Sequence, residues 1–92
     1  MSSVNGKVVF ITGGARGVGA EVARRLRRKG AKLVLTDLDP APLAELADEL
    51  GGEAHVLTAL ADVRDLTAMQ RAADAAVARF GGIDIVVANA GI

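Results

Sequence analysis

The chain of 92 residues contains no cysteine, tryptophan or tyrosine, and its aromatic residues are two phenylalanines. Without cysteine there is no disulfide framework, thiol nucleophile or cysteine metal site, and this composition suits a cytosolic protein. No run of 18 apolar residues is present, which argues against a membrane span, and the polar first six residues do not resemble a signal peptide. We therefore expect a cytoplasmic protein with no metal site and no membrane partner.

The charge of the chain is balanced overall but divided along its length. Eleven basic and eleven acidic residues cancel, yet residues 1–32 carry eight Lys and Arg against one acidic residue, a net charge of +7, and the rest carries −7. The basic run at residues 24–29 is the strongest argument for a nucleic-acid module. A solvated helix face with cations at its C-terminal end, where the helix dipole favours them, explains the same run. Because no aromatic stacking residues accompany it, we expect no nucleic-acid partner.

Apolar runs and amphipathic stretches alternate along the chain. Nearly continuous apolar, β-branched runs predict buried strands at residues 7–12 and 32–37, and shorter runs predict strands at 54–60 and 83–88. The resulting order βαβαβαβ predicts a parallel sheet with right-handed helical crossovers. We expect half of a Rossmann-type doubly wound sheet with strand order 3-2-1-4. The 92 residues are expected to form one incomplete domain, since no linker or repeat divides them.

The spacing of apolar residues predicts three helices between these strands. An apolar ridge of Val18, Val22 and Leu26 marks the first, Asp39 caps the second, and Asp65 caps the third. The expected buried faces are Leu43, Leu46, Ala47 and Leu50 in the second helix and Met69, Ala73, Ala76 and Phe80 in the third.

The fourth strand is expected to form one edge of the sheet. Residues 83–88 form an apolar run that carries no charge after Asp84, which is the opposite of a protected natural edge. We therefore expect a fifth strand, or another chain, to cover it.

A glycine-rich loop, Thr-Gly-Gly-Ala-Arg-Gly-Val-Gly at residues 12–19, joins the first strand to the first helix. The unpaired N–H groups and partial positive charge of a helix N-terminus attract phosphate, and glycines let the backbone approach a pyrophosphate. An ordinary tight turn is the alternative interpretation of a lone glycine cluster. The spacing G-x-x-x-G-x-G differs from the common G-x-G-x-x-G fingerprint, and no Gly-Lys-Ser/Thr follows to make a P-loop.

Asp37 ends the second strand, eighteen residues after Gly19. Ligands of open α/β sheets bind at this edge, where a carboxylate accepts hydrogen bonds from both ribose hydroxyls of an adenosine. A turn or helix cap is the other interpretation, but Asp37 precedes the cap residue Asp39 by two positions, which favours the ribose role.

These features resemble the short-chain dehydrogenase/reductase family. The loop is similar to that family's T-G-x-x-x-G-x-G motif, and Asp62 and Val63 resemble the Asp-Val pair that the family places against adenine. Residues 88–91, Ala-Asn-Ala-Gly, resemble the N-N-A-G motif, with Ala88 in place of the first Asn. The resemblance spans nearly the whole chain and implies hydride transfer between a nicotinamide cofactor and an alcohol or carbonyl substrate.

The resemblance also implies a site for a pyridine dinucleotide. Asp37 would repel the 2′-phosphate of NADP, whereas Arg16 resembles the basic position that NADP-using relatives employ. Because repulsion by the carboxylate is the more direct effect, we expect NAD rather than NADP. The implied residues are Gly13, Arg16, Gly17, Val18 and Gly19 around the pyrophosphate and adenosine ribose, Asp37 and Leu38 at that ribose, Asp62 and Val63 at adenine, and Asn89, Ala90 and Gly91 at the nicotinamide-side ribose.

The family's catalytic Tyr-x-x-x-Lys pair, with its Ser and further Asn, lies downstream of the N-N-A-G motif. The chain has no tyrosine, so we expect no catalytic residue within it. The resemblance therefore implies the cofactor-binding half of a dehydrogenase, with an alcohol or ketone substrate and a homo-oligomeric assembly for the intact protein. Two alternatives stay open: a truncated nucleotide-binding fragment without turnover, and part of an S-adenosylmethionine-binding methyltransferase, whose sheet also holds an adenosine ribose through an acidic residue.

Overall fold

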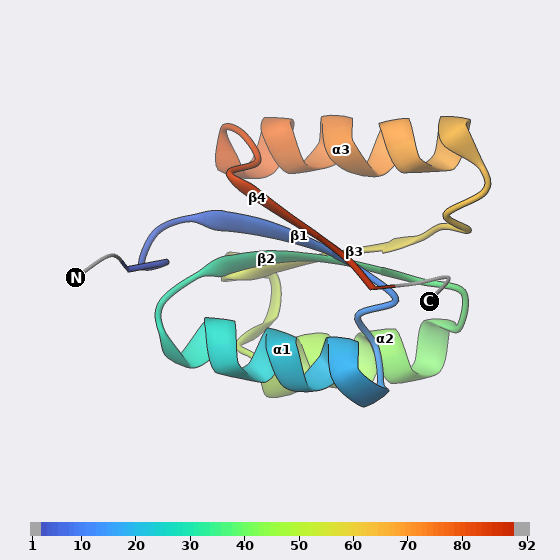
Figure 1. The fold of residues 1–92 in the computed structure, drawn as a ribbon. Helices are drawn as coiled ribbons and strands as arrows, with labels where there is room; N and C mark the ends of the chain where they lie inside the picture. The colour runs from blue at the N-terminus through green and yellow to red at the C-terminus, as the bar shows by residue number, and fades with distance from the viewer. Residues whose placement is uncertain (1–2, 90–92) are drawn as a thin grey trace.

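The structure, a computed structural model, describes residues 3–89 and places a four-stranded sheet between two helical layers (Figure 1). Strands and helices alternate as expected from the apolar runs. The elements are β1 (Val8–Thr12), α1 (Gly17–Arg28), β2 (Lys32–Asp37), α2 (Pro40–Glu49), the short 3₁₀ helix η1 (Gly52–Ala54), β3 (Val56–Leu60), α3 (Leu66–Phe80) and β4 (Ile85–Ala88).

All paired strands are parallel, and their order is β3-β2-β1-β4. This order confirms the predicted 3-2-1-4 arrangement and the Rossmann-type fold class. The chain builds outward from β1 to β3 and then returns to place β4 on the other side of β1. In such sheets a ligand crevice opens at the carboxyl ends of the strands, where the direction of building reverses.

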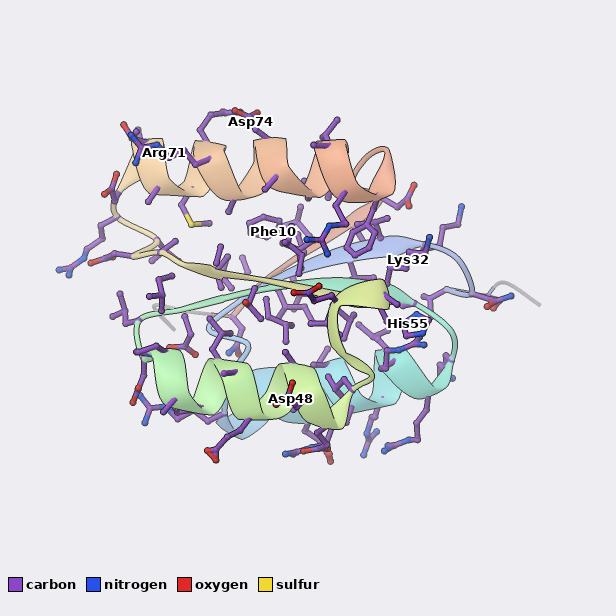
Figure 2. The ribbon with its side chains drawn as sticks, turned by 180° about the vertical axis from the view of Figure 1, so that it is seen from behind. Phe10, Lys32, Asp48, His55, Arg71 and Asp74 are labelled. Atoms are coloured by element: carbon purple, nitrogen blue, oxygen red, sulfur yellow. The ribbon has the colours of Figure 1, made fainter. Side chains whose placement is uncertain are left out.

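The central strand β1 contributes to two separate cores, because successive side chains of a strand point to opposite faces. Val9 and Ile11 pack on the side of α1 and α2, whereas Val8 and Phe10 pack on the side of α3. Figure 2 shows Phe10 between the sheet and α3. All five residues of β1 are buried, which confirms the prediction of a strand covered on both faces.

Helix α1 buries only part of the face that was predicted. Val18 is 71% exposed, so its assignment to the apolar ridge is wrong, although Val22 and Leu26 do pack against the core. The buried residues of α1 are Gly19, Ala20 and Ala23. The first turn of the helix lies directly against the glycine loop, where a Cβ on Gly19 would collide with the carbonyl oxygen of Gly13.

Helices α2 and α3 begin at the predicted caps. The side chain of Asp39 accepts a hydrogen bond from the N–H of Ala41, and that of Asp65 accepts one from the N–H of Ala68. In α2 the predicted buried face is confirmed, with Ala47 only partly buried. In α3 the fully buried residues are Ala72 and Ala76, while three of the predicted residues are partly buried: Met69, Ala73 and Phe80.

The last two strands are shorter than predicted. The turn of η1 takes up the start of the range 54–60, so that β3 begins at Val56. Strand β4 begins at Ile85, because Asp84 is used at the strand entrance, where its Oδ2 accepts a hydrogen bond from the N–H of Val8 at 2.8 Å. The side chains of Ile85 and Val86 are 39% and 63% exposed, which confirms that β4 is an uncovered apolar edge within the described residues.

Neither a helix able to cross a membrane nor a metal cluster is found in residues 3–89. None of their helices combines the length and the apolar composition that a bilayer crossing requires. No group of His, Asp and Glu in this range is arranged to hold a metal ion.

Candidate functional site

A cavity of about 520 Å³ opens at the carboxyl edge of the sheet, among the segments that follow β1, β2 and β3. This is the edge at which parallel α/β sheets bind ligands. The cavity contains residues from three of the predicted motifs, which lie far apart in the sequence. Its lining residues are Gly13, Asp37, Leu38, Ala61, Asp62, Val63 and Arg64.

The glycine loop passes tightly between β1 and α1. Gly17 begins the helix with a φ of +60°, a conformation that residues with a side chain rarely adopt. At Gly19 an added Cβ would collide with the carbonyl oxygen of Gly13 and lie 2.9 Å from Nδ2 of Asn89. The loop is also bonded to β2, because the N–H of Gly14 donates a hydrogen bond to the carbonyl of Thr36 at 3.1 Å. Position 19 must therefore be glycine for α1 to pack this closely against the loop.

The N-terminus of α1 differs from those of the other two helices. Its N-cap residue, Arg16, has an extended backbone and makes no side-chain capping hydrogen bond within the described residues, whereas Asp39 and Asp65 cap α2 and α3. The first turn of α1 contains no acidic residue, and Arg16, Gly17 and Val18 are exposed. The N–H groups of this turn, with the positive end of the helix dipole, can therefore receive an anion.

The carboxylate of Asp37 is oriented by the backbone on two sides. Its Oδ2 accepts a hydrogen bond from the N–H of Ala15 at 3.0 Å, and its Oδ1 accepts one from the N–H of Leu38 at 2.7 Å. Asp37 is half-buried at the cavity and is not the cap of α2, since Asp39 has that role. The carboxylate can still accept further hydrogen bonds, because each of its oxygens has two acceptor positions.

Asp62 and Arg64, which also line the cavity, form a closely bonded pair. Oδ1 of Asp62 accepts hydrogen bonds from the backbone N–H and Nε of Arg64 at 2.9 and 3.0 Å. Its Oδ2 accepts from Nη2 at 2.7 Å and from Nε at 3.2 Å. These hydrogen bonds lower the pKa of Asp62 from 3.8 to about 2, so the carboxylate is ionised at neutral pH.

Asn89 connects the end of β4 to the glycine loop. Its backbone N–H donates to Oγ1 of Thr12 at 3.0 Å, and its Nδ2 donates to the carbonyl of Gly13 at 3.2 Å. The predicted partners of Asn89 in the site, Ala90 and Gly91, lie outside the described residues.

Three residues of this edge were not found from the sequence: Ala15, Arg64 and Ala61, the last of which lines the cavity. Arg64 lines the cavity and bonds Asp62, and the spacing Asp-x-Arg directly after a predicted strand is a signal that could have indicated the pair. Ala15 contributes only its backbone N–H to Asp37, which no side-chain pattern reveals.

The basic run of α1 is partly occupied by contacts within the chain, away from the carboxyl edge. Nε of Arg24 lies 2.7 Å from Oε2 of Glu49. The guanidinium of Arg27 donates to the carbonyls of Leu50 and Ala31 at 3.1 and 2.8 Å. Two arginines of the basic run therefore have a structural role, because they attach α1 to the end of α2 and to the residue that precedes β2.

Comparison with known proteins identifies relatives of nearly the whole chain. A family model described as short chain dehydrogenase matches residues 7–92. Oxidoreductase UcpA of Salmonella typhimurium is 45% identical over 93 residues, which cover 100% of this chain and 35% of that protein. A 1,6-dihydroxycyclohexa-2,4-diene-1-carboxylate dehydrogenase of Pseudomonas putida is 46% identical over 86 residues, covering 94% of this chain and 32% of that protein. The chain thus spans about a third of the length of these curated relatives.

Solved structures show the same fold. A short-chain dehydrogenase/reductase from Brucella melitensis superposes with a TM-score of 0.92 at 35% identity, over 100% of this chain and 39% of that one. A short chain dehydrogenase/reductase from Burkholderia phymatum, solved in complex with NAD, has a TM-score of 0.86 at 36% identity, over 94% of this chain and 31% of that one. With the family model matched over residues 7–92 and the fold shared, the chain belongs to the short-chain dehydrogenase family.

Proposed function

We propose that this chain binds the nicotinamide dinucleotide of an NAD-dependent oxidoreductase, which transfers a hydride between the cofactor and an alcohol or carbonyl substrate. One observation carries the proposal. The N-terminus of α1, which has no side-chain cap, and the carboxylate of Asp37 lie on either side of the same glycine loop. The N–H of Ala15 in this loop donates a hydrogen bond to that carboxylate. The helix N-terminus can receive a pyrophosphate, and the carboxylate can accept hydrogen bonds from ribose hydroxyls.

The residues of this edge fit such a group. Gly19 leaves no room for a Cβ, so the loop backbone lies close to the start of α1, as a pyrophosphate site requires. The cavity beside Asp37 continues to Asp62 and Val63, where the adenine would lie. When bound, the cofactor supplies the hydride acceptor or donor. The proposed binding residues are those implied by the motifs: Gly13, Arg16, Gly17, Val18, Gly19, Asp37, Leu38, Asp62, Val63, Asn89, Ala90 and Gly91.

NAD is the proposed cofactor rather than NADP. A 2′-phosphate would meet the carboxylate of Asp37, which is fixed in place by two backbone hydrogen bonds. Arg16 is exposed at the start of α1 and is the one basic residue of the loop. A 3-ketoacyl-(acyl-carrier-protein) reductase from Brucella melitensis solved with NADH, at 37% identity, and the NAD complex described above support a nicotinamide dinucleotide as the ligand.

Turnover is assigned to the intact protein, of which this chain would be the cofactor-binding half. The chain contains no tyrosine to act as the family's acid and base. An alcohol or ketone substrate, a homo-oligomeric assembly and a cytosolic location belong to the same proposal. Membership of the dehydrogenase family supports it over the alternative of an S-adenosylmethionine-binding methyltransferase.

Isothermal titration calorimetry of the chain with NADH, NADPH and S-adenosylmethionine tests the proposal. We expect saturable binding of NADH, weaker binding of NADPH and none of S-adenosylmethionine. Circular dichroism at each endpoint confirms that the protein titrated is folded. Binding of S-adenosylmethionine in preference to NADH would contradict the assignment, and so would a folded chain that binds none of the three.

A further inference from the structure

A second cavity lies at the amino edge of the sheet, opposite the cavity that contains Asp37. Helices α1 and α2 each begin after the carboxyl end of one strand and end before the amino end of the next, so their C-terminal ends share this edge (Figure 1). A cavity of about 440 Å³ opens between these two ends, and three arginines and one glutamate give its lining a net formal charge of +2. The lining residues are Arg24, Arg27, Arg28, Glu49, Leu50 and Gly51.

The basic run of α1 is divided between this cavity and the outer surface of the helix. Arg24, Arg27 and Arg28 have the spacing i, i+3 and i+4, which places them on one face of the helix, and all three line the cavity. Arg25 belongs to the same run and is exposed outside this lining. The fold therefore gathers three of the positive charges at one place, rather than spreading them evenly around the helix.

Two of these guanidinium groups are held in place by hydrogen bonds within the chain. Nε and Nη2 of Arg24 donate to the carboxylate of Glu49 at 2.7 and 3.2 Å. Nε and Nη1 of Arg27 donate to the carbonyls of Leu50 and Ala31 at 3.1 and 2.8 Å. A guanidinium has five N–H donors in a rigid fork, so these bonds also set the directions of the donors that they do not use. A ligand bound there would meet donors that are already ordered, which lowers the entropic cost of binding.

We propose that this cavity binds a small dianionic oxyanion, a phosphate monoester or inorganic phosphate, at a site separate from the proposed cofactor site. Arginine forks recognise phosphate through paired N–H···O bonds, and a tetrahedral anion presents several oxygens to donors from more than one side. Arg24 and Arg27 supply the ordered donors, and the exposed Arg28 supplies a further positive charge. The volume of the cavity lies within the range of small-molecule sites.

A nucleic acid fits this place less well than a small anion. Proteins that bind single strands combine a basic groove with aromatic side chains on which the bases stack. Both phenylalanines of the chain, Phe10 and Phe80, belong to the core on the α3 side of the sheet, whereas the cavity lies on the side of α1 and α2. The lining thus offers charge and hydrogen-bond donors without a stacking surface.

Glu49 gives the proposal a test in which affinity should rise. Its carboxylate orients Arg24, but its negative charge opposes the bound anion. In Glu49→Gln the amide oxygen can still accept a hydrogen bond from Arg24 while the charge is removed. We expect this variant to bind phosphate about threefold more tightly. Weaker binding in Glu49→Gln would contradict a site that is selected by charge.

The test is an NMR titration of the chain with inorganic phosphate and with glycerol phosphate, at about pH 7.5, where a phosphate monoester is a dianion. We expect the Nε–H signals of Arg24, Arg27 and Arg28 to shift with one common dissociation constant, and the signal of Arg71 on the outer face of α3 to stay unchanged (Figure 2). Tighter binding of glycerol phosphate would identify a phosphorylated small molecule as the ligand, and equal binding would identify the free anion. Loss of the shifts at about 0.15 M salt, where diffuse surface attraction is screened, would overturn the site.

Two variants of equal charge separate the cavity from the basic run as a whole. Arg28→Gln removes a lining charge and should weaken phosphate binding by about threefold to tenfold. Arg25→Gln removes the same charge from the same helix outside the lining, and should change the dissociation constant by less than about twofold. Circular dichroism checks that both variants are folded.

Equal losses of affinity in Arg28→Gln and Arg25→Gln would overturn the proposal, because they would show diffuse attraction to the helix. Phosphate-induced shifts confined to the backbone amides of residues 17–19 would also overturn it, since the anion would then bind at the N-terminus of α1. A short single-stranded RNA is the remaining probe. If it binds more tightly than phosphate and loses affinity equally in both variants, the basic run serves an extended polyanion and the small-anion site is excluded.

Discussion

The carboxylate of Asp37, at the end of β2, accepts a hydrogen bond from the backbone N–H of Ala15, in the glycine loop after β1, at 3.0 Å. The bond joins the two segments that the proposed cofactor site requires to be close together. It also orients the carboxylate in advance, which reduces the entropy lost when a ligand binds.

Replacement of Asp37 by asparagine is expected to weaken NAD binding by about tenfold to a hundredfold, because an acceptor oxygen bonded to a backbone N–H becomes an amide donor or a neutral acceptor. The preference for NAD over NADP should fall as well, since the charge that repels the 2′-phosphate is removed. Calorimetric titration with both cofactors measures the two effects. Asp48→Asn, an exposed carboxylate of α2, is the matched control, and equal losses in the two variants would contradict the assigned role (Figure 2).

Gly19→Ala is expected to destabilise the fold by about 1–3 kcal/mol, because the new Cβ would collide with the carbonyl of Gly13 and force α1 away from the loop. Urea denaturation measures the loss, and NADH binding should fall with it. Gly82→Ala is the control, since its Cβ would meet nothing within 4 Å. A Gly19→Ala protein as stable as Gly82→Ala would show that the close approach is not required.

Thr36 of β2 and Thr12 of β1 are neighbours in the sheet register, but their hydroxyl groups differ in hydrogen bonding. Within residues 3–89 Oγ1 of Thr36 is buried without a hydrogen-bond partner, whereas Oγ1 of Thr12 accepts from the N–H of Asn89. Thr36→Val should therefore stabilise the fold by about 1 kcal/mol, and Thr12→Val should destabilise it by about 1–3 kcal/mol. Thermal unfolding of the two variants checks the contrast, which fails if their melting temperatures shift in the same direction.

The pKa of Asp62 in the folded protein, about 2, lies below its ordinary value of 3.8 because of the hydrogen bonds from Arg64. A lowered pKa in the folded state means that the pair stabilises the fold above about pH 4 and that this contribution is lost as the pH falls toward 2. Carboxyl carbon NMR should give a titration midpoint near 2 for Asp62 and a midpoint returned toward 3.8 in Arg64→Gln. An unchanged midpoint in the variant would contradict the pairing.

Strand β4 is expected to mediate self-association of the chain, because its edge is apolar and uncovered within the described residues. Val86→Lys places a charge on that edge and should shift the chain toward monomer in sedimentation velocity experiments. Val77→Lys changes a valine of similar exposure on α3, 52% against 63%, and should have no such effect. Identical sedimentation of the two variants would exclude β4 as the contact.

Most of the fold could be predicted from the sequence, because each element has a local cause. Continuous apolar runs give strands buried on both faces, and Asp39 and Asp65 cap helices through hydrogen bonds to their own neighbours. The positions of Asp37 and Asp62 at the ends of two strands place both at one edge of a parallel sheet, and the structure brings both to the same cavity.

The face that α1 buries could not be predicted in this way. The apolar spacing included Val18, but the helix approaches the loop so closely at Gly19 that a Cβ there would collide with the carbonyl oxygen of Gly13. Helical periodicity describes hydrophobicity and not the distance between two packed elements, so the exposure of Val18 followed only from packing.

What the sequence by itself determined is the order of the elements, their caps and the glycine spacing, since these depend on residues close together along the chain. Tertiary structure alone decided that Asp37 bonds Ala15, that Asn89 bonds Gly13, and that Asp62 with its partner Arg64 shares a cavity with Asp37. The residues joined between segments are separated by 22 and 76 positions in the two bonds. Their contact depends on the parallel pairing of β4, β1 and β2 in one sheet, which brings the carboxyl ends of these strands within hydrogen-bonding reach of one another.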